Sequence, residues 1–172
     1  LTKLLSEHPE YLGTHAAGLV DHGLPILVKF IDAKSQLSVQ VHPSDEYALE
    51  YENSLGKTEM WYVLDAKPDS SLIYGFNRNV EIAEVRAKIE DGTIEELLNH
   101  VDVHKGDLFF IEPGTVHAIG AGILLAEVQE SSNITYRLYD YDRVDKHGNK
   151  RTLQVEKALS VLDLKSSASP RQ

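Results

Sequence analysis

The sequence predicts a mostly β protein, a jelly roll or barrel with a small helical insertion. Three observations support this fold class: many short runs of β-branched and aromatic residues, glycine and proline residues that punctuate them, and one stretch between residues 79 and 100 with helical spacing of its apolar residues. Short strands at close intervals with one helical insert are typical of an antiparallel barrel and not of a parallel sheet.

The first predicted strands cover residues 26–31 and 37–42, which are rich in β-branched residues and are separated by a polar stretch. A hairpin is the simplest connection between them. After the second strand, Ser44 is placed to cap a short helix over residues 45–50, whose first turn carries acidic residues that the helix dipole favours. Gly56 ends the segment that contains this helix.

Strand character returns in residues 59–64 and 71–76, and the turn-forming segment between them predicts a second antiparallel pair. Later strands are predicted in four segments, residues 107–111, 116–119, 122–128 and 135–140. The glycine and proline residues between these segments mark the turns.

The predicted helical insertion lies between the two groups of strands. Ile82, Val85 and Ile89 recur at helical spacing, which indicates one amphipathic helix. Thr93 and Glu96 then form a capping-box pattern, which predicts the start of a second short helix.

Length, composition and charge limit the classes of protein. With 172 residues and 42% hydrophobic content, the chain is long enough to bury one core, and it has no apolar run of membrane-spanning length and no signal-peptide layout at its start. The absence of cysteine excludes disulfides and thiolate metal sites and favours a cytoplasmic protein. A formal net charge of −10 argues against nucleic acid as a partner, while a phosphorylated small molecule still fits a locally positive pocket.

Four side chains with metal-binding groups occur at strand positions. Gln40 and His42 alternate correctly to share one face of a predicted strand, Glu59 opens another strand, and His117 follows a Pro-Gly turn. If these faces line the barrel interior, an amide oxygen, a carboxylate and two imidazoles converge there. The competing explanation is that each is an ordinary hydrogen-bonded or solvent-facing residue. The coincidence of four suitable residues favours a metal site.

Four motifs carry a resemblance to a known family. They are LSVQVHP at residues 37–43, GKTEMWY at 56–62, the stretch from Gly106-Asp107 to IEPGTVHAI at 111–119, and SSNITYRLYDYDR at 131–143. In this order they resemble type I mannose-6-phosphate isomerase in its short bacterial form, over residues 25–162.

The resemblance implies a cupin jelly roll, one zinc ion held by Gln40, His42, Glu59 and His117, and the interconversion of mannose 6-phosphate and fructose 6-phosphate. It also implies that residues 1–165 form a single cupin domain that lacks the second jelly-roll region of longer relatives. We expect residues 166–172 to be a disordered tail.

Candidate catalytic residues are Lys57, Arg137 and Glu127. Lys57 shares a strand face with Glu59, and a nearby cation would lower its pKa so that it could accept a proton. Arg137 is permanently charged and suits a phosphate group or an enediolate, and Glu127 matches an active-site carboxylate of the family. Candidate substrate-binding residues are Ser38, Lys57 and Arg137.

Sugar isomerisation removes a carbon-bound proton beside a carbonyl, and a cation stabilises the negative charge that develops. Asn133 departs from the family pattern, which has Asp in many members, so a proton relay cannot be transferred to it. Two other functions stay open: a non-catalytic, metal-containing cupin that binds sugar phosphates, and a metal-dependent cupin dioxygenase. The native metal and the oligomeric state are not determined by the sequence.

Overall fold

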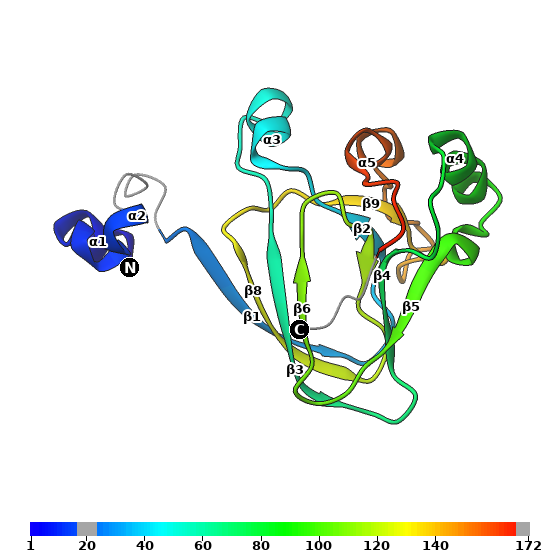
Figure 1. The fold of residues 1–172 in the computed structure, drawn as a ribbon, viewed down its shortest axis with the longest axis horizontal. Helices are drawn as coiled ribbons and strands as arrows, with labels where there is room; N and C mark the ends of the chain where they lie inside the picture. Colours follow the sequence, from blue (N-terminus) through cyan, green and yellow to red (C-terminus); the bar gives the residue numbers. More distant parts are fainter. Residues whose placement is uncertain (17–23, 168–172) are drawn as a thin grey trace.

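Nine strands form two antiparallel sheets in this computed structural model, which describes residues 1–16 and 24–167 (Figure 1). We call them sheet A and sheet B. Sheet A has the order β1-β8-β3-β6, with bounds Ile26–Ala33, Ile123–Glu130, Glu59–Ala66 and Leu108–Ile111. Sheet B has the order β5-β4-β7-β2-β9, with bounds Leu98–Asp102, Ser71–Phe76, His117–Ala118, Val39–Val41 and Tyr136–Tyr139. The predicted mostly β jelly-roll fold with a helical insertion is confirmed.

Short helices accompany the sheets. They are α1 (Thr2–Glu7), η1 (Pro9–Leu12), α2 (Gly13–Ala16), α3 (Asp45–Tyr51), α4 (Ile82–Glu90), η3 (Ile94–Leu97) and α5 (Val155–Val161). In the part of the chain that the structure describes, none has the length and apolar character that crossing a membrane demands. Ser44 caps α3 as predicted, since its hydroxyl accepts a hydrogen bond from the Tyr47 amide at 3.4 Å.

The predicted capping box at Thr93 does not form. Thr93 precedes η3 without a side-chain cap, and its hydroxyl donates instead to Asp91. The Glu96 carboxylate is 2.7 Å from the Lys88 ammonium. The ion pair with Lys88 and the local Asp91 turn therefore take the two side chains that the capping box needs.

Both predicted strand pairings are wrong. β1 pairs with β8 in sheet A, whereas β2 pairs with β7 and β9 in sheet B, so residues 26–31 and 37–42 form no hairpin. β3 and β4 are likewise in different sheets. In a jelly roll the chain crosses between two sheets, and neighbours in sequence need not be neighbours in a sheet.

The elements that were not predicted are α1, η1 and α2 at the start of the chain, the strand β5 and the helix α5. β5 is an edge strand beside β4, and its sequence LNHVD has only two apolar residues, three positions apart, so it lacks the alternation of a strand and was assigned to the end of the helical insertion. α5 packs over sheet B and buries Ala158 and Leu159. Its seven residues are too few for a clear helical period.

The apolar core has two parts. Trp61, Phe109 and Leu125 belong to a cluster between the two sheets, and Val41 and Leu138 belong to a second cluster on the outer side of sheet B. Residues of α4, η3 and α5 contribute to this second cluster, and Figure 1 shows these helices beside sheet B. One face of sheet B is therefore covered by helices and the other by sheet A.

The predicted domain boundary at residue 165 and the predicted tail stay predictions. Ser166 forms a parallel bridge with Phe76, and the Ser167 amide donates to the Phe76 carbonyl at 3.0 Å. The remainder of the predicted tail, residues 168–172, lies outside the described residues.

Candidate metal centre

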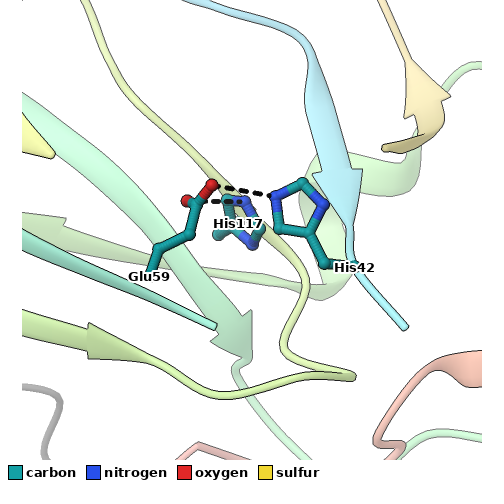
Figure 2. A group of neighbouring side chains, drawn as sticks. All are labelled: His42, Glu59 and His117. Atoms are coloured by element: carbon teal, nitrogen blue, oxygen red, sulfur yellow. Dashed lines mark ion pairs between the residues drawn. The ribbon is translucent and has the colours of Figure 1, made fainter. Parts of the chain in front are cut away.

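The predicted metal ligands come together from both sheets at one end of the barrel. Gln40 lies on β2 opposite His117 on β7, His42 follows β2 directly, and Glu59 begins β3 in the facing sheet. Figure 2 shows His42, Glu59 and His117 pointing toward one another. The alternation of side chains on each short strand, which underlay the prediction, thus places these groups in the interior.

Three of these side chains form a compact buried group. Glu59 Oε1 is 3.2 Å from His42 Nε2, and Glu59 Oε2 is 3.7 Å from His117 Nε2. One ligand atom from each residue lies within 4.8 Å of the others, and all three residues are buried. This group could hold a metal ion, because two imidazoles and a carboxylate are suitable ligands for zinc and related divalent ions.

Main-chain carbonyl groups fix how both imidazoles point. His42 Nδ1 is 3.0 Å from the Ile134 carbonyl oxygen, and His117 Nδ1 is 2.8 Å from the Thr115 carbonyl oxygen. A proton on each Nδ1 satisfies these carbonyls, so each Nε2 keeps its lone pair free for an ion. His42 Nε2 is buried and has no hydrogen-bond partner in the described residues. An unpartnered lone pair that faces a carboxylate is costly without a cation, so the donor set fits a metal.

Burial and charge tune the titration of this group. Burial lowers the pKa of His117 to about 4 and also lowers the pKa of His42, so both are neutral at pH 7. Burial alone raises the pKa of Glu59, but the close approach of the His42 and His117 imidazoles and the charge of Lys57 bring it to about 2. Neutral imidazoles and an ionised carboxylate are the protonation states that a metal requires.

Gln40 lies beside the group as the predicted fourth ligand. Its amide nitrogen is placed 3.3 Å from His117 Nε2. Amide oxygen and nitrogen are assigned from the hydrogen-bond network, and a rotation of the amide presents its oxygen to the same position. The Gln40 side chain is therefore within reach of an ion held by the other three.

Lys57 is buried next to Glu59. Its Nζ is 3.5 Å from Glu59 Oε1 and 3.4 Å from the Thr135 hydroxyl, and only 5% of the residue is exposed. Burial, and then the charge of Lys29, lower the pKa of Lys57, while Glu59 opposes the shift. A lowered pKa favours the neutral amine of Lys57, and that amine is a candidate proton acceptor.

Gly56 sets the position of Lys57. A Cβ atom at residue 56 would lie 2.4 Å from the Ser44 carbonyl carbon and 2.5 Å from the Pro43 carbonyl oxygen. The loop before β3 packs directly on residues 43–45, and the Lys57 amide donates to the Pro43 carbonyl at 3.1 Å. The contact needs a residue without a side chain.

Ser132 ties this loop to the segment before β9. Its hydroxyl donates to the Leu55 carbonyl at 2.8 Å and accepts from the Ile134 amide at 3.3 Å. Ile134 in turn supplies the carbonyl that orients His42. One buried hydroxyl therefore links the loop that carries Lys57 with the partner of a candidate ligand.

Arg137 and Ser38 are in contact with each other. Arg137 is opposite Gln40 in the β2–β9 pairing, and its Nε donates to the Ser38 hydroxyl at 2.9 Å. These two predicted substrate-binding residues therefore lie beside Gln40, with Arg137 opposite it on β9 and Ser38 two residues before it. Asn133 is exposed in the loop before β9.

Glu127 belongs to a group with Lys29 and Gln129, two residues that the sequence analysis did not identify. Lys29 on β1 lies opposite Glu127 on β8, its Nζ is 2.7 Å from Glu127 Oε1, and it also binds the amide oxygen of Gln129. Glu127 and Gln129 are buried on the inner face of sheet A. The signal for Lys29 was present, because a lone lysine in the apolar run of residues 26–31 needs either solvent or a buried partner.

The site is more positive than the molecule as a whole. Lys29, Lys57 and Arg137 bring three cations to a site with two carboxylates, while the chain has a net charge of −10. A bound divalent ion would add to this local positive charge. The arrangement can therefore attract an anionic small molecule, hold a metal beside it and accept a proton.

Two of three comparisons with known proteins find similar proteins, and these belong to one group of enzymes. No family model matches the chain. Over 167 residues it is 46% identical to the mannose-6-phosphate isomerase ManA of Bacillus subtilis, an alignment that covers 96% of this chain and 51% of that protein. It is 43% identical over 169 residues to the mannose-6-phosphate isomerase of Streptococcus mutans, covering 98% of this chain and 52% of that protein.

The solved structures that resemble this chain are also mannose-6-phosphate isomerases. The crystal structure of the mannose 6-phosphate isomerase from Bacillus subtilis matches with a TM-score of 0.83 and 38% identity, covering 95% of this chain and 51% of that one. A phosphomannose isomerase from Salmonella typhimurium, 16% identical with a TM-score of 0.70, covers 97% of this chain and 61% of that one and shows the shared fold alone. The chain spans about half the length of the curated relatives it matches.

Proposed function

This chain is related to the mannose-6-phosphate isomerases over nearly its whole length, and from that relationship we propose that it carries the metal-binding and catalytic part of such an isomerase. The reaction is the interconversion of mannose 6-phosphate and fructose 6-phosphate through an enediolate. The observation that carries the proposal is the buried His42–Glu59–His117 group with the Lys57 ammonium 3.5 Å from its carboxylate.

Gln40, His42, Glu59 and His117 hold one zinc ion in this proposal. A bound zinc ion supplies a Lewis acid for the negative charge that develops on a sugar oxygen. The isomerisation needs no change in the oxidation state of the metal, and zinc is not redox-active. The free Nε2 of His42 and the ionised Glu59 carboxylate support this assignment.

Lys57 accepts the carbon-bound proton. Its lowered pKa makes the neutral amine more accessible than in an exposed lysine, and its burial excludes competing water from the ammonium. Glu59 is itself a candidate ligand, so a different group must act as the mobile base. The protein thus divides the work between an anionic ligand and a neighbouring amine.

Arg137 and Ser38 bind the anionic part of the substrate. The guanidinium fork suits phosphate oxygens, and the Ser38 hydroxyl in contact with it offers a further donor. Glu127, held by Lys29, lies on the inner face of sheet A across from Trp61 and is the second candidate for proton transfer. A hexose phosphate is the partner that this charge arrangement favours, and a cytoplasmic location stays a prediction.

A coupled assay with mannose 6-phosphate tests the proposal. The zinc-loaded chain should convert the substrate, whereas the chelated chain and Glu59→Gln should not. Lys57→Met should lower turnover by about 10²- to 10⁴-fold, the usual contribution of a general base, and keep its bound zinc. Undiminished conversion in the chelated and Glu59→Gln samples would contradict the mechanism.

The chain spans about half of its relatives, which favours one second candidate, a metal-containing domain that binds sugar phosphate without turnover. Calorimetry with mannose 6-phosphate separates the two. Binding at micromolar to millimolar affinity by a zinc-loaded chain that shows no conversion would support the binding domain. Metal analysis that found iron in place of zinc would instead favour the dioxygenase alternative.

A further inference from the structure

The outer face of sheet A carries two apolar rows that cross all four strands. The register places the first row at Val28, Val128, Met60 and Phe110. The second row is Phe30, Ala126, Tyr62 and Leu108. Because side chains alternate along a strand, every residue in these rows points away from the buried core.

None of the residues in the two rows is buried. Phe30 is 75% exposed, Val28 is 52% exposed, and Tyr62 and Phe110 are each 43% exposed. Charged residues flank the two rows in the neighbouring register positions, at Asp32 and Asp65, which both lie opposite Leu124, and at Glu130 opposite Ile26. The outer face of an antiparallel sheet is normally polar when it faces water, so an apolar face with a charged rim indicates an interaction surface.

The two sheets differ in what covers them. Residues of α4, η3 and α5 pack on the outer side of sheet B, and Figure 1 shows these helices there and none of them over β1, β8, β3 or β6. Sheet A is therefore the uncovered layer among the described residues.

Area and charge distinguish two candidates that could cover this face: a second copy of this chain, and another part of the same polypeptide. Four strands at about 4.8 Å spacing and two rows at about 6.8 Å spacing give roughly 260 Å² of flat apolar area. Two separate molecules that bind stably bury about 800 Å² each, and net charge of −10 opposes a second copy of this chain. Contacts between parts of one polypeptide are held by the linkage itself and begin at about 600 Å² in total, or about 300 Å² on each side, which is close to the area of this face.

The relatives contain such an additional part. About half of the Bacillus subtilis and Streptococcus mutans isomerases lies outside the match with this chain, and the same holds for the solved Bacillus subtilis structure. We propose that the outer face of sheet A docks the polypeptide that forms this other half. The surface is distinct from the metal centre, whose side chains point into the barrel.

Cysteine labelling tests the proposal cleanly, because the chain has no cysteine of its own. Tyr62→Cys and Phe110→Cys place a thiol in each row, and Leu49→Cys on α3, where Leu49 is 58% exposed, is the matched control. The rate of maleimide labelling is measured in this chain alone and in a chimera in which it replaces the matched stretch of the Bacillus subtilis isomerase. Labelled sites are identified by peptide mass spectrometry.

Both face cysteines should react in the chain alone at about the rate of the control, and at least about tenfold more slowly in the chimera. Equal labelling of the face cysteines in both proteins overturns the proposal, as does protection of Leu49→Cys while the face stays reactive. Protection in the chain alone that grows with protein concentration also overturns it, because a second copy then covers the face.

A second measurement guards against a chimera that fails to fold. The same cysteines are placed at the aligned positions of the intact Bacillus subtilis isomerase, where labelling at the control rate overturns the proposal. No arm of the experiment depends on bound metal or on turnover. A failure of the isomerase proposal therefore leaves the labelling result unchanged.

Discussion

Replacing Glu59 with glutamine keeps the shape of the side chain and removes the one carboxylate of the His42–Glu59–His117 group. A unit charge about 4 Å from another at an effective dielectric constant of about 20 contributes about 4 kcal/mol. A divalent ion held among these atoms should lose at least that much, which corresponds to about a 1,000-fold weaker affinity.

Thermal unfolding measures this loss. Zinc at about 1,000 times its dissociation constant stabilises the folded chain by about 4 kcal/mol, and each kcal/mol shifts Tm by about 2–4 °C in a protein of this size. Zinc should therefore raise the Tm of the metal-free wild-type chain by about 8–16 °C. At the same concentration, zinc should raise the Tm of Glu59→Gln by only about 1 °C, because its dissociation constant is then close to the zinc concentration.

Two controls accompany this experiment. Glu96→Gln removes a carboxylate whose side chain is 64% exposed and pairs with Lys88, and it should keep the full response to zinc. Circular dichroism of metal-free Glu59→Gln checks that the variant is folded. A folded variant with the wild-type rise in Tm would refute the assignment of Glu59 as a ligand.

Three further predictions concern stability. In the chelated chain, burial holds the pKa of His117 at about 4, against 6.5 in the unfolded chain. The contribution of His117 to stability is therefore full above pH 6.5 and is lost as the pH falls toward 4. Urea unfolding should show a loss of about 3 kcal/mol over this pH range, and a stability that does not change with pH would contradict a neutral buried imidazole. Gly56→Ala, whose Cβ would lie 2.4 Å from the Ser44 carbonyl carbon, should cost about 1–3 kcal/mol in the same assay, and a neutral effect would mean that the loop yields without strain. Leu125→Ala, at a fully buried position, should cost about 2–5 kcal/mol, while Leu49→Ala, at an exposed one, should change stability by less than about 0.5 kcal/mol; similar values for both would be inconsistent with the described core.

Alternation along strands explains what the sequence could predict. Gln40 and His42 occupy positions two apart, so local backbone geometry alone aims both at one face, and the strand that starts at Glu59 is clear from its β-branched and aromatic residues. His117 follows a turn that its own Pro-Gly pair specifies. The candidate ligands were therefore visible because each is placed by its own short segment.

Pairing partners and edges could not be predicted in the same way. Which strand lies beside β1 is decided by packing over the whole barrel, and no residue within 26–33 encodes β8 as its neighbour. The contact of Lys29 with Glu127 could not be predicted for this reason, because it joins residues 98 positions apart in the sequence. β5 was missed for a related reason: an edge strand exposes polar side chains such as His100 and lacks the apolar signal of a central strand.

The hydroxyl of Ser132 has a dynamic consequence. Local opening of residues 131–135 would break its hydrogen bonds and would free the carbonyl that aligns His42 and the loop that bears Lys57 in one event. An ion that keeps His42 aligned would oppose that opening, so amide hydrogen exchange in this segment should slow when the ion is present. Binding of the ion would then order the loop that carries Lys57, and opening of this loop would weaken binding of the ion.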